Sequence, residues 1–349
     1  MNKTLTALCL IGIALSSCDK TNSTPEDASG TEKTNAGVTS QDTSNAVSIP
    51  IAEQAELLDI RYAVKPGDVF HYKMSAVSSM EEDTLRLETR TTQFYTKKVK
   101  SVRSDGSIEL TLRYDSMMVA SSMKNLKNPA QMRERKFNST NPEDKKNPEF
   151  ANYMVLIGED VTMLVSPKGV IEEISGFTPI YNKIVGDKKD SVPADQRDMI
   201  IERLKAEMYA IPLQQEFITY PDSIPDSTRS WSKTFSIPLA GTFAANSTII
   251  YTVRDIKKIR DRNVIEIGSR VNSVVTNPKV ENQQLSAKLN SNKVTGSGRI
   301  LLDAQKGYTI LKNQNLTQFI DATLTDKQSK QEMRRVQKQS SSVAIELLR

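Results

Sequence analysis

The sequence predicts an α+β protein built on one large, curved antiparallel sheet. Most of the chain after Leu57 alternates apolar and polar residues with a period of two, which is typical of strands with one buried face. Turn-forming residues interrupt this pattern, and helical signals gather in the middle of the chain. Strands, a helical insert and strands again give an α+β order, without the βαβ alternation of a nucleotide-binding parallel sheet.

The clearest predicted hairpin surrounds Asp105-Gly106. In the segment 108–115, Ile, Leu, Leu and Tyr alternate with Glu, Thr, Arg and Asp, so one face is expected in the core and the other in water. Asp-Gly between two such runs is the strongest short-range hairpin signal. Similar turn sequences occur at 65–68, 166–169, 261–263 and 306–307. They divide the chain into about eleven strands, and long strands suit a strongly curved sheet.

Three helices are expected between the strands, and we expect the sheet to pack over two or three of them. The first follows Asn147-Pro148, which offer an N-cap and a first helical residue, and stops at Gly158. The second covers 177–185. The third begins near Pro193 and ends before Pro212. Its expected buried face holds Ile200, Leu204 and Met208.

Composition excludes several kinds of chemistry. The 349 residues contain one histidine, His71, and two cysteines, Cys9 and Cys18. These counts exclude zinc sites built on several His or Cys side chains, Cys–His nucleophilic catalysis and redox Cys-x-x-Cys pairs. No Walker, Rossmann or nucleophile-elbow glycine pattern occurs. We therefore expect no catalytic, cofactor-binding or metal-binding residue, and no enzyme activity.

The N-terminus carries an export signal. Lys3 precedes an apolar run over 5–15, which is too short for a membrane span of about 20 residues. The next residues, Leu15-Ser16-Ser17-Cys18, resemble the lipobox of bacterial lipoproteins. That resemblance implies a signal peptide over 1–17 and acylation of Cys18, for example with palmitate, as the membrane anchor. An ordinary secretory signal with an incidental cysteine is the alternative.

The segment after the cysteine predicts a flexible tether. It is rich in Ser, Thr, Asn, Asp, Glu, Gly and Lys and has almost no apolar residues, so it cannot offset the entropy of ordering. We expect a disordered tether over 18–48 and one α+β domain over 49–349. Loss of the signal peptide lowers the formal charge from +5 to +4, which does not indicate nucleic-acid binding. Asp19 follows the acylated cysteine, and whether this residue retains a lipoprotein at the inner membrane depends on the bacterial host. We expect this protein at the outer rather than the inner membrane.

Few residues of the folded part are candidates for a site. His71 is expected on a strand, as an exposed or singly hydrogen-bonded side chain. The run Glu81-Glu82-Asp83 is interpreted as a solvated loop, not as the paired carboxylates of a glycosidase. Asp222 and Asp226 flank a proline-rich turn that lacks the ligand spacing of a calcium loop.

The remaining candidates are aromatic, basic or sulfur-containing. The single tryptophan, Trp231, is expected to anchor a sheet end in the core, with ligand stacking as the alternative. Basic loop residues are expected to be solvated or to rest on anionic lipid or glycan: Lys257, Lys258, Arg260, Arg262, Arg133, Arg135, Lys136, Lys145 and Lys146. Methionines are expected in the core or as the lining of a groove: Met74, Met80, Met117, Met118, Met123, Met154 and Met163.

Three stretches, 58–72, 156–176 and 220–231, resemble an uncharacterised family of lipidated bacterial envelope proteins known by a domain of unknown function. The resemblance covers about 57–325. It implies a curved antiparallel sheet wrapped over helices, similar to lipoprotein-carrier (Lol-type) folds, and it implies no catalytic residue. This chain departs from the family before its tryptophan, where it has Thr228-Arg229-Ser230 instead of a glycine and an acid.

These expectations combine into one function. We expect a non-catalytic lipoprotein of the bacterial cell envelope, facing the periplasm, that binds a hydrophobic or lipidic ligand in a groove of its sheet. A long curved sheet closed by few helices tends to leave a cavity, and such cavities take apolar molecules. The alternative is an interaction or scaffold subunit of an envelope protein complex. Lipid analysis of the purified protein separates the two.

Overall fold

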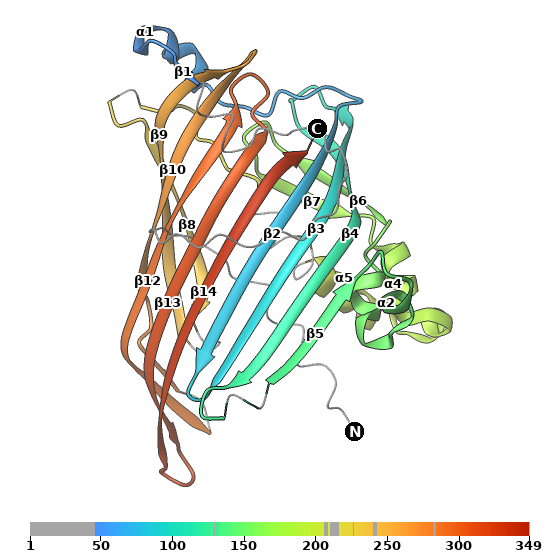
Figure 1. The fold of residues 1–349 in the computed structure, drawn as a ribbon, viewed down its shortest axis with the longest axis vertical. Helices are drawn as coiled ribbons and strands as arrows, with labels where there is room; N and C mark the ends of the chain where they lie inside the picture. Colours follow the sequence, from blue (N-terminus) through green and yellow to red (C-terminus); the bar gives the residue numbers. More distant parts are fainter. Residues whose placement is uncertain are drawn as a thin grey trace.

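Antiparallel strands form one continuous sheet that curves around a concave inner face (Figure 1). The computed structural model describes residues 46–348, apart from 129, 131, 206–208, 210–215, 226, 240–242 and 282–283. The predicted large, curved antiparallel sheet is confirmed. It has fourteen strands in the described residues rather than about eleven, because short pairings such as β1 and β11 leave almost no periodic signal in the sequence.

The sheet runs in the order β1-β9-β10-β12-β13-β14-β2-β3-β4-β6-β7, with β8 beside β9, β5 beside β4 and β11 beside β12. The strands are β1 (Val47–Ser48), β2 (Val69–Glu82), β3 (Leu85–Val102), β4 (Ile108–Asn125), β5 (Met132–Asn138), β6 (Asp160–Val165), β7 (Ile171–Ser175), β8 (Ser230–Leu239), β9 (Phe243–Ile259), β10 (Arg262–Val275), β11 (Lys279–Glu281), β12 (Leu285–Asp303), β13 (Thr309–Asp326) and β14 (Glu332–Leu348). The helices are α1 (Ile51–Gln54), η2 (Ala55–Leu58), α2 (Pro142–Lys146), η3 (Pro148–Phe150), α3 (Ala151–Met154), α4 (Thr178–Val185), η4 (Gly186–Ser191) and α5 (Ala194–Leu204).

The predicted turns lie between strands. Gly106 joins β3 to β4 with a φ of 83°, a conformation that glycine adopts at little cost. The Asp105 carboxylate accepts a hydrogen bond from the Ser107 amide at 2.8 Å and fixes the turn. The turn between β12 and β13, which contains Gly307, and the turn between β6 and β7 are formed in the same way.

The folded part begins slightly earlier than expected. Val47 and Ser48, assigned above to the tether, form β1 and pair with Lys258 and Lys257 of β9. A two-residue strand carries no period, so the sequence offers no sign of this pairing. The signal peptide, Cys18 and the rest of the tether lie outside the described residues.

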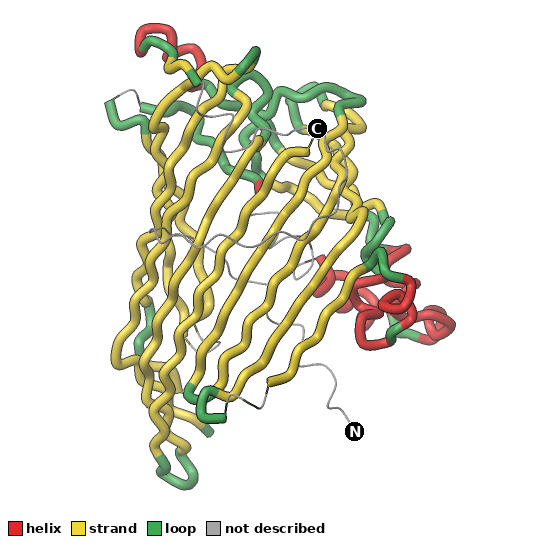
Figure 2. The backbone as a smooth tube through the Cα atoms, viewed as in Figure 1, coloured by secondary structure: helices red, strands yellow, loops and turns green. Residues whose placement is uncertain are grey.

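Helices α2 to α5 gather beside the β5–β7 edge of the sheet, not over its middle, whereas α1 lies at the other edge beside β1 (Figures 1 and 2). The Asn147 side chain accepts a hydrogen bond from the Glu149 amide, as an N-cap does, and α4 matches the predicted 177–185 helix. The third helix, α5, follows Pro193 as predicted, but Ile200 and Leu204 are only half-buried because the helix lies at the edge. Met208 and Pro212 lie outside the described residues. None of the helices in the described ranges has the length and apolar run needed to cross a membrane.

Strand register decides which side chains face the concave side. Along β13 the inner positions are Lys312, Gln314, Leu316, Gln318 and Ile320, which are all buried. The intervening residues are more exposed and lie on the convex side. Register then extends each inner position across the sheet: Gln314 pairs with Gly298 on β12 and with Val343 on β14.

Two connecting segments close the upper end of the sheet, where β2 begins and β14 ends in Figure 1. The Tyr62 amide donates to the Pro167 carbonyl at 2.9 Å, and the Tyr220 amide donates to the Lys168 carbonyl at 2.8 Å. The rings of Tyr62 and Tyr220 lie 5.5 Å apart. A side chain at Gly169 would collide with the Ile218 carbonyl, so this turn must be glycine for the segment to pack so closely. The larger apolar core fills this end.

Candidate functional site

A buried ion pair lies at the centre of the upper core. Lys97 on β3 pairs with Glu216, and their side chains are 6% and 3% exposed. The Tyr95 hydroxyl donates to the Glu216 carboxylate at 2.7 Å. The Lys97 ammonium also lies 4.4 Å from the ring centroid of Tyr72 and 4.7 Å from that of Phe217. Both buried charges are therefore compensated, which is the condition for their tolerance in a core.

The tyrosines around this pair stay protonated. Burial, followed by the charge of Glu216, raises the pKa of Tyr72 and of Tyr95 well above its usual range. Neutral hydroxyls can then act as donors, and the Tyr72 hydroxyl donates to the Thr309 carbonyl at 2.9 Å. The Tyr220 hydroxyl likewise donates to the Gly307 carbonyl at 2.9 Å. These contacts hold the 216–220 segment against the sheet.

The middle of the concave face is different, because its buried polar groups lack partners. We call five of these side chains the polar belt: Gln93, Ser269, Gln314, Gln318 and Ser341. They are 2% to 5% exposed and come from β3, β10, β13 and β14. Each has at least one buried oxygen or nitrogen with no hydrogen-bond partner in the described part of the chain. An unsatisfied buried polar group typically costs about 1–3 kcal/mol, so this accumulation requires an explanation.

Apolar side chains alternate with the polar belt. Leu316, Val343 and Ala76 lie on the same inner face. Toward the lower end this face becomes accessible: Met80 and Leu87 are half-buried, and Met123 is 39% exposed. The concave face is therefore amphipathic: polar groups lie at depth, and at the lower end apolar Met80, Leu87 and Met123 lie on the same face as the Glu82–Arg335 ion pair.

The methionines do not all line this face. By register, Met74, Met80, Met117 and Met123 are on it, as expected for a groove lining. Met118 follows Met117 and faces the convex side, because successive strand residues point in opposite directions. Met163 is fully buried in the apolar core, and Met154 lies on α3.

Lys312 stands out among the inner-face residues. It pairs in register with Ile300 on β12 and Ile345 on β14, and it is 2% exposed. Burial lowers the pKa of Lys312 to about 7; Glu216 opposes this shift and Lys233 adds to it. We find no hydrogen bond or ion pair to the Lys312 ammonium among the described residues.

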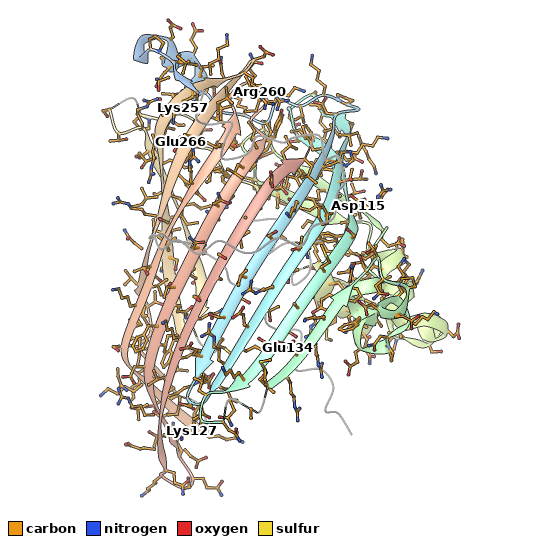
Figure 3. The ribbon with its side chains drawn as sticks, in the orientation of Figure 1. Asp115, Lys127, Glu134, Lys257, Arg260 and Glu266 are labelled. Carbon is orange, nitrogen blue, oxygen red and sulfur yellow. The ribbon has the colours of Figure 1, made fainter. Side chains whose placement is uncertain are left out.

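His71 and Glu81 lie outside this face, whereas Glu82 shares the inner face with Met80. His71 is exposed on the convex side, with Nδ1 2.9 Å from the Thr96 hydroxyl, which confirms the expected singly bonded histidine. The Thr96 hydroxyl in turn donates to Asp115, labelled in Figure 3. Glu81 and Glu82 are strand residues rather than loop residues, because β2 continues to a tight turn at Asp83. Alternation along β2 sends their carboxylates to opposite faces, where each meets an arginine.

Trp231 is a packing residue of β8, as predicted. It is half-buried, its ring stacks on Tyr251 with centroids 5.2 Å apart, and its indole N–H donates to the Thr219 carbonyl at 3.0 Å. Asp222 is fully exposed, and Asp226 lies outside the described residues. In the ranges that the structure describes, no three His, Cys, Asp or Glu side chains form a group able to hold a metal.

The basic hairpin tip between β9 and β10 is partly neutralised (Figure 3). Lys257 pairs with Glu266 at 2.8 Å, and Arg299 pairs with the same carboxylate at 2.9 Å. Partial burial opposes ionisation, but hydrogen bonds from Arg299 and Lys257 lower the pKa of Glu266 to about 2. Lys258 and Arg260 line a surface recess of about 1080 Å³ beside α1. The other predicted basic run, 133–136, is exposed on β5.

Sequence reasoning missed Lys97, Glu216, Lys312 and the polar belt. The alternation within β13 holds the missing signal, because Lys312 and Gln314 share their parity with Leu316 and Ile320. Polar residues in phase with apolar ones indicate a core face that carries hydrogen-bonding groups. Glu216 gives no such signal, since it lies outside the strands.

Comparison with known proteins identifies the family but no function. No curated protein sequence matches the chain. Among solved structures, lipovitellin, described for its lipid–protein interactions, has a TM-score of 0.42 at 10% identity over 81% of this chain, which spans 25% of the lipovitellin chain. An outer membrane channel from Pseudomonas putida F1 has a TM-score of 0.15 at 6% identity, over 81% of this chain and 97% of the channel. These TM-scores are too low to establish a shared fold. The family model called "Family of unknown function (DUF6263)" matches residues 105–309, which is more than half of the chain, and the protein therefore belongs to that family.

Proposed function

We propose that the concave face of the sheet binds an amphipathic, lipidic ligand without catalysing a reaction. The polar belt carries this proposal, because its unpartnered amides and hydroxyls are buried beside apolar side chains. A fold that keeps unsatisfied buried groups gives up stability, and an external molecule that pairs with them recovers it. A ligand with both polar and apolar parts fits such a surface.

The structure favours entry from the lower end. The upper end is closed by the packed aromatic side chains of Tyr62, Phe217 and Tyr220. At the lower end, Leu85 and Met123 are exposed on or next to the inner face. Exposed methionines give an adaptable apolar surface at low cost in strain.

The anchor and location belong to the same proposal. Acylation of Cys18 would hold the protein on a bacterial envelope membrane, with the outer membrane preferred. Residues 19–45 would then allow the domain to move over roughly 25–30 Å from the lipid surface, if they behave as a flexible chain. A protein held in this way is suited to receive or deliver a membrane-derived ligand.

Lipid extraction and mass spectrometry of the purified protein test the function. We expect one lipid species at near-stoichiometric amount. Met123→Asp should lower the bound lipid several-fold, whereas Met118→Asp should leave it unchanged. These two methionines are 39% and 38% exposed but lie on opposite faces, so they form a matched pair. Absence of lipid from the wild type would favour the alternative, a scaffold subunit of an envelope complex.

A separate experiment tests the anchor. Labelled fatty acid should attach to the wild type, and Cys18→Ala should abolish both the label and membrane retention. Pelleting of the Cys18→Ala protein with membranes would show that lipidation is not the sole anchor. Limited proteolysis should remove residues 19–45 and leave the sheet domain intact.

A further inference from the structure

The inner face of the sheet carries an excess positive charge at Lys312. Glu216 is engaged by Lys97 through an ion pair and by Tyr95 through a hydrogen bond. Lys233, the other lysine whose field acts on Lys312, is on the exposed strand β8 and donates to the Thr219 hydroxyl. Among the described residues, Lys312 therefore has Glu216 as a neighbouring charge but no anion of its own. A buried ammonium between two isoleucines is expensive unless an anion pairs with it.

Two polar-belt residues, Gln314 and Ser269, converge at Gly298 of β12, one inner position along the sheet from Lys312. Gly298 pairs with Ser269 on one side and Gln314 on the other. A Cβ atom at Gly298 would lie 2.7 Å from the Gln314 Cγ and 2.9 Å from the Ser269 hydroxyl. Because Gly298 has no side chain, the side chains of Gln314 and Ser269 can occupy the space beside it. Lys312 is the preceding inner residue of the Gln314 strand.

We propose that Lys312, Gln314 and Ser269 bind the anionic head group, a carboxylate or a phosphate, of the lipidic ligand. The inference rests on the proposed function and adds the chemical class of the ligand. The three side chains supply an ammonium, an amide N–H and a hydroxyl, all of which donate to anionic oxygens. The ammonium also gives the site a charge opposite to that of the head group.

The position of this site orients the ligand. Along the inner face of β13, Lys312 is followed by Gln314, Leu316, Gln318 and Ile320 in the direction of the lower end of the sheet. An acyl chain that follows this strand would pass the apolar residues Leu316 and Ile320. The head group would then lie at depth and the tail would point outward, toward Leu87 and Met123.

Binding should depend on pH because Lys312 changes charge near neutrality. The charged groups that act on it are Glu216 from the 216–220 segment and Lys233 from β8, while Lys97 is held in its pair with Glu216. Protonated Lys312 attracts the anion, so affinity should fall as the pH rises from about 6 to about 9. Bound anion will raise the pKa of Lys312, which moves the midpoint of this loss upward.

The test compares three amphiphiles with the same tail, hexadecanoate, hexadecyl phosphate and hexadecanol, on the delipidated full-length protein by titration calorimetry. We expect at least one anion to bind about tenfold more tightly than the alcohol, the effect of one charge-assisted contact. Lys312→Met should abolish this preference and its pH dependence, and leave hexadecanol binding unchanged. Lys233→Met is the control and should keep the preference. The anion that binds more tightly identifies a fatty acid or a phospholipid source.

Each contrary result has one meaning. Equal binding of all three amphiphiles by the wild type would overturn the head-group site and leave the proposed function standing. A preference that survives in Lys312→Met would do the same. Binding of none of the three would overturn the proposed function itself. If Lys312→Met fails to fold, the pH dependence of the wild type and the loss of preference in Gln314→Leu decide the matter.

Discussion

The upper core and the polar belt both bury polar side chains, but these side chains have hydrogen-bond or ion-pair partners in the upper core and lack them in the polar belt. In the upper core, Lys97, Glu216, Tyr95 and Tyr72 are joined by an ion pair, hydrogen bonds and ring contacts. In the polar belt, Gln314 lacks a partner at both its amide atoms among the described residues. Both regions share the inner face of the same sheet.

The difference separates a structural polar network from a binding surface. A buried network whose partners are all in the chain fixes one arrangement of its segments. A buried group whose partner is missing from the chain lowers stability and gains it back only when something else binds. The upper core therefore holds the fold together, and the polar belt is where we expect function to limit stability.

Loss of Glu216 should have the largest effect. Glu216→Gln removes the partner of Lys97 and leaves a buried ammonium, so the free energy of unfolding should fall by about 3–5 kcal/mol. Urea denaturation measures this change. Glu281→Gln is the control, since Glu281 is exposed and pairs with Lys279 and Lys327 at the surface. A loss for Glu216→Gln as small as that of the control would mean that the pair does not hold the 216–220 segment.

Trp231→Ala should cause the second-largest fall in the free energy of unfolding. It removes the stacking on Tyr251 and the hydrogen bond to Thr219, but the side chain is only half-buried, so we expect a loss of about 2–4 kcal/mol. Trp231→Phe should retain much of the stability. An unchanged melting temperature in Trp231→Ala, together with lost ligand, would move this residue from the upper core to the binding surface.

Replacement of Lys312 should raise stability. The pKa of Lys312 is lowered from 10.5 to about 7, so between these values the unfolded chain binds more protons than the folded one. The stability of the wild type should therefore increase as pH rises through this window, and Lys312→Met should lack that increase. Below pH 7, where the penalty of the buried ammonium is fully present, the substitution should stabilise the ligand-free protein. Thermal melts across this pH range would contradict the assignment if the two proteins responded alike.

The smallest changes in the free energy of unfolding should have opposite signs in the polar belt and in the upper core. Gln318→Leu removes a buried amide whose Oε1 lacks a partner among the described residues and should stabilise the ligand-free protein by about 1 kcal/mol. Tyr72→Phe removes a hydroxyl that is bonded to the Thr309 carbonyl and should destabilise it by about 1 kcal/mol. Chemical denaturation of both variants compares the regions directly. Destabilisation by Gln318→Leu would show that this residue has a structural partner after all.

The sequence predicted the sheet but not the candidate site. Strict alternation near Tyr114 and the Asp105-Gly106 turn depend on local residues, and both appear in the structure. The placement of α5 at the sheet edge depends on tertiary packing, so its spacing suggested more burial than Ile200 and Leu204 have. Lys312 looks like an ordinary strand lysine until register places it between two isoleucines. The partnership of Lys97 with Glu216 joins residues 119 positions apart, which no local pattern encodes.

The pairing of β14 with β2 has a consequence for how the protein folds. The first long strand, Val69–Glu82, acquires one of its two neighbours only when the last strand, Glu332–Leu348, is present. Contacts between such distant segments are slow to form, and unpaired strand edges invite association with other chains. Until the 17 residues of β14 are present, the chain exposes the edges of β2 and β13 in the middle of its sheet. Its two halves therefore mature together, and a chain stopped before β14 would be left as two open, aggregation-prone sheets.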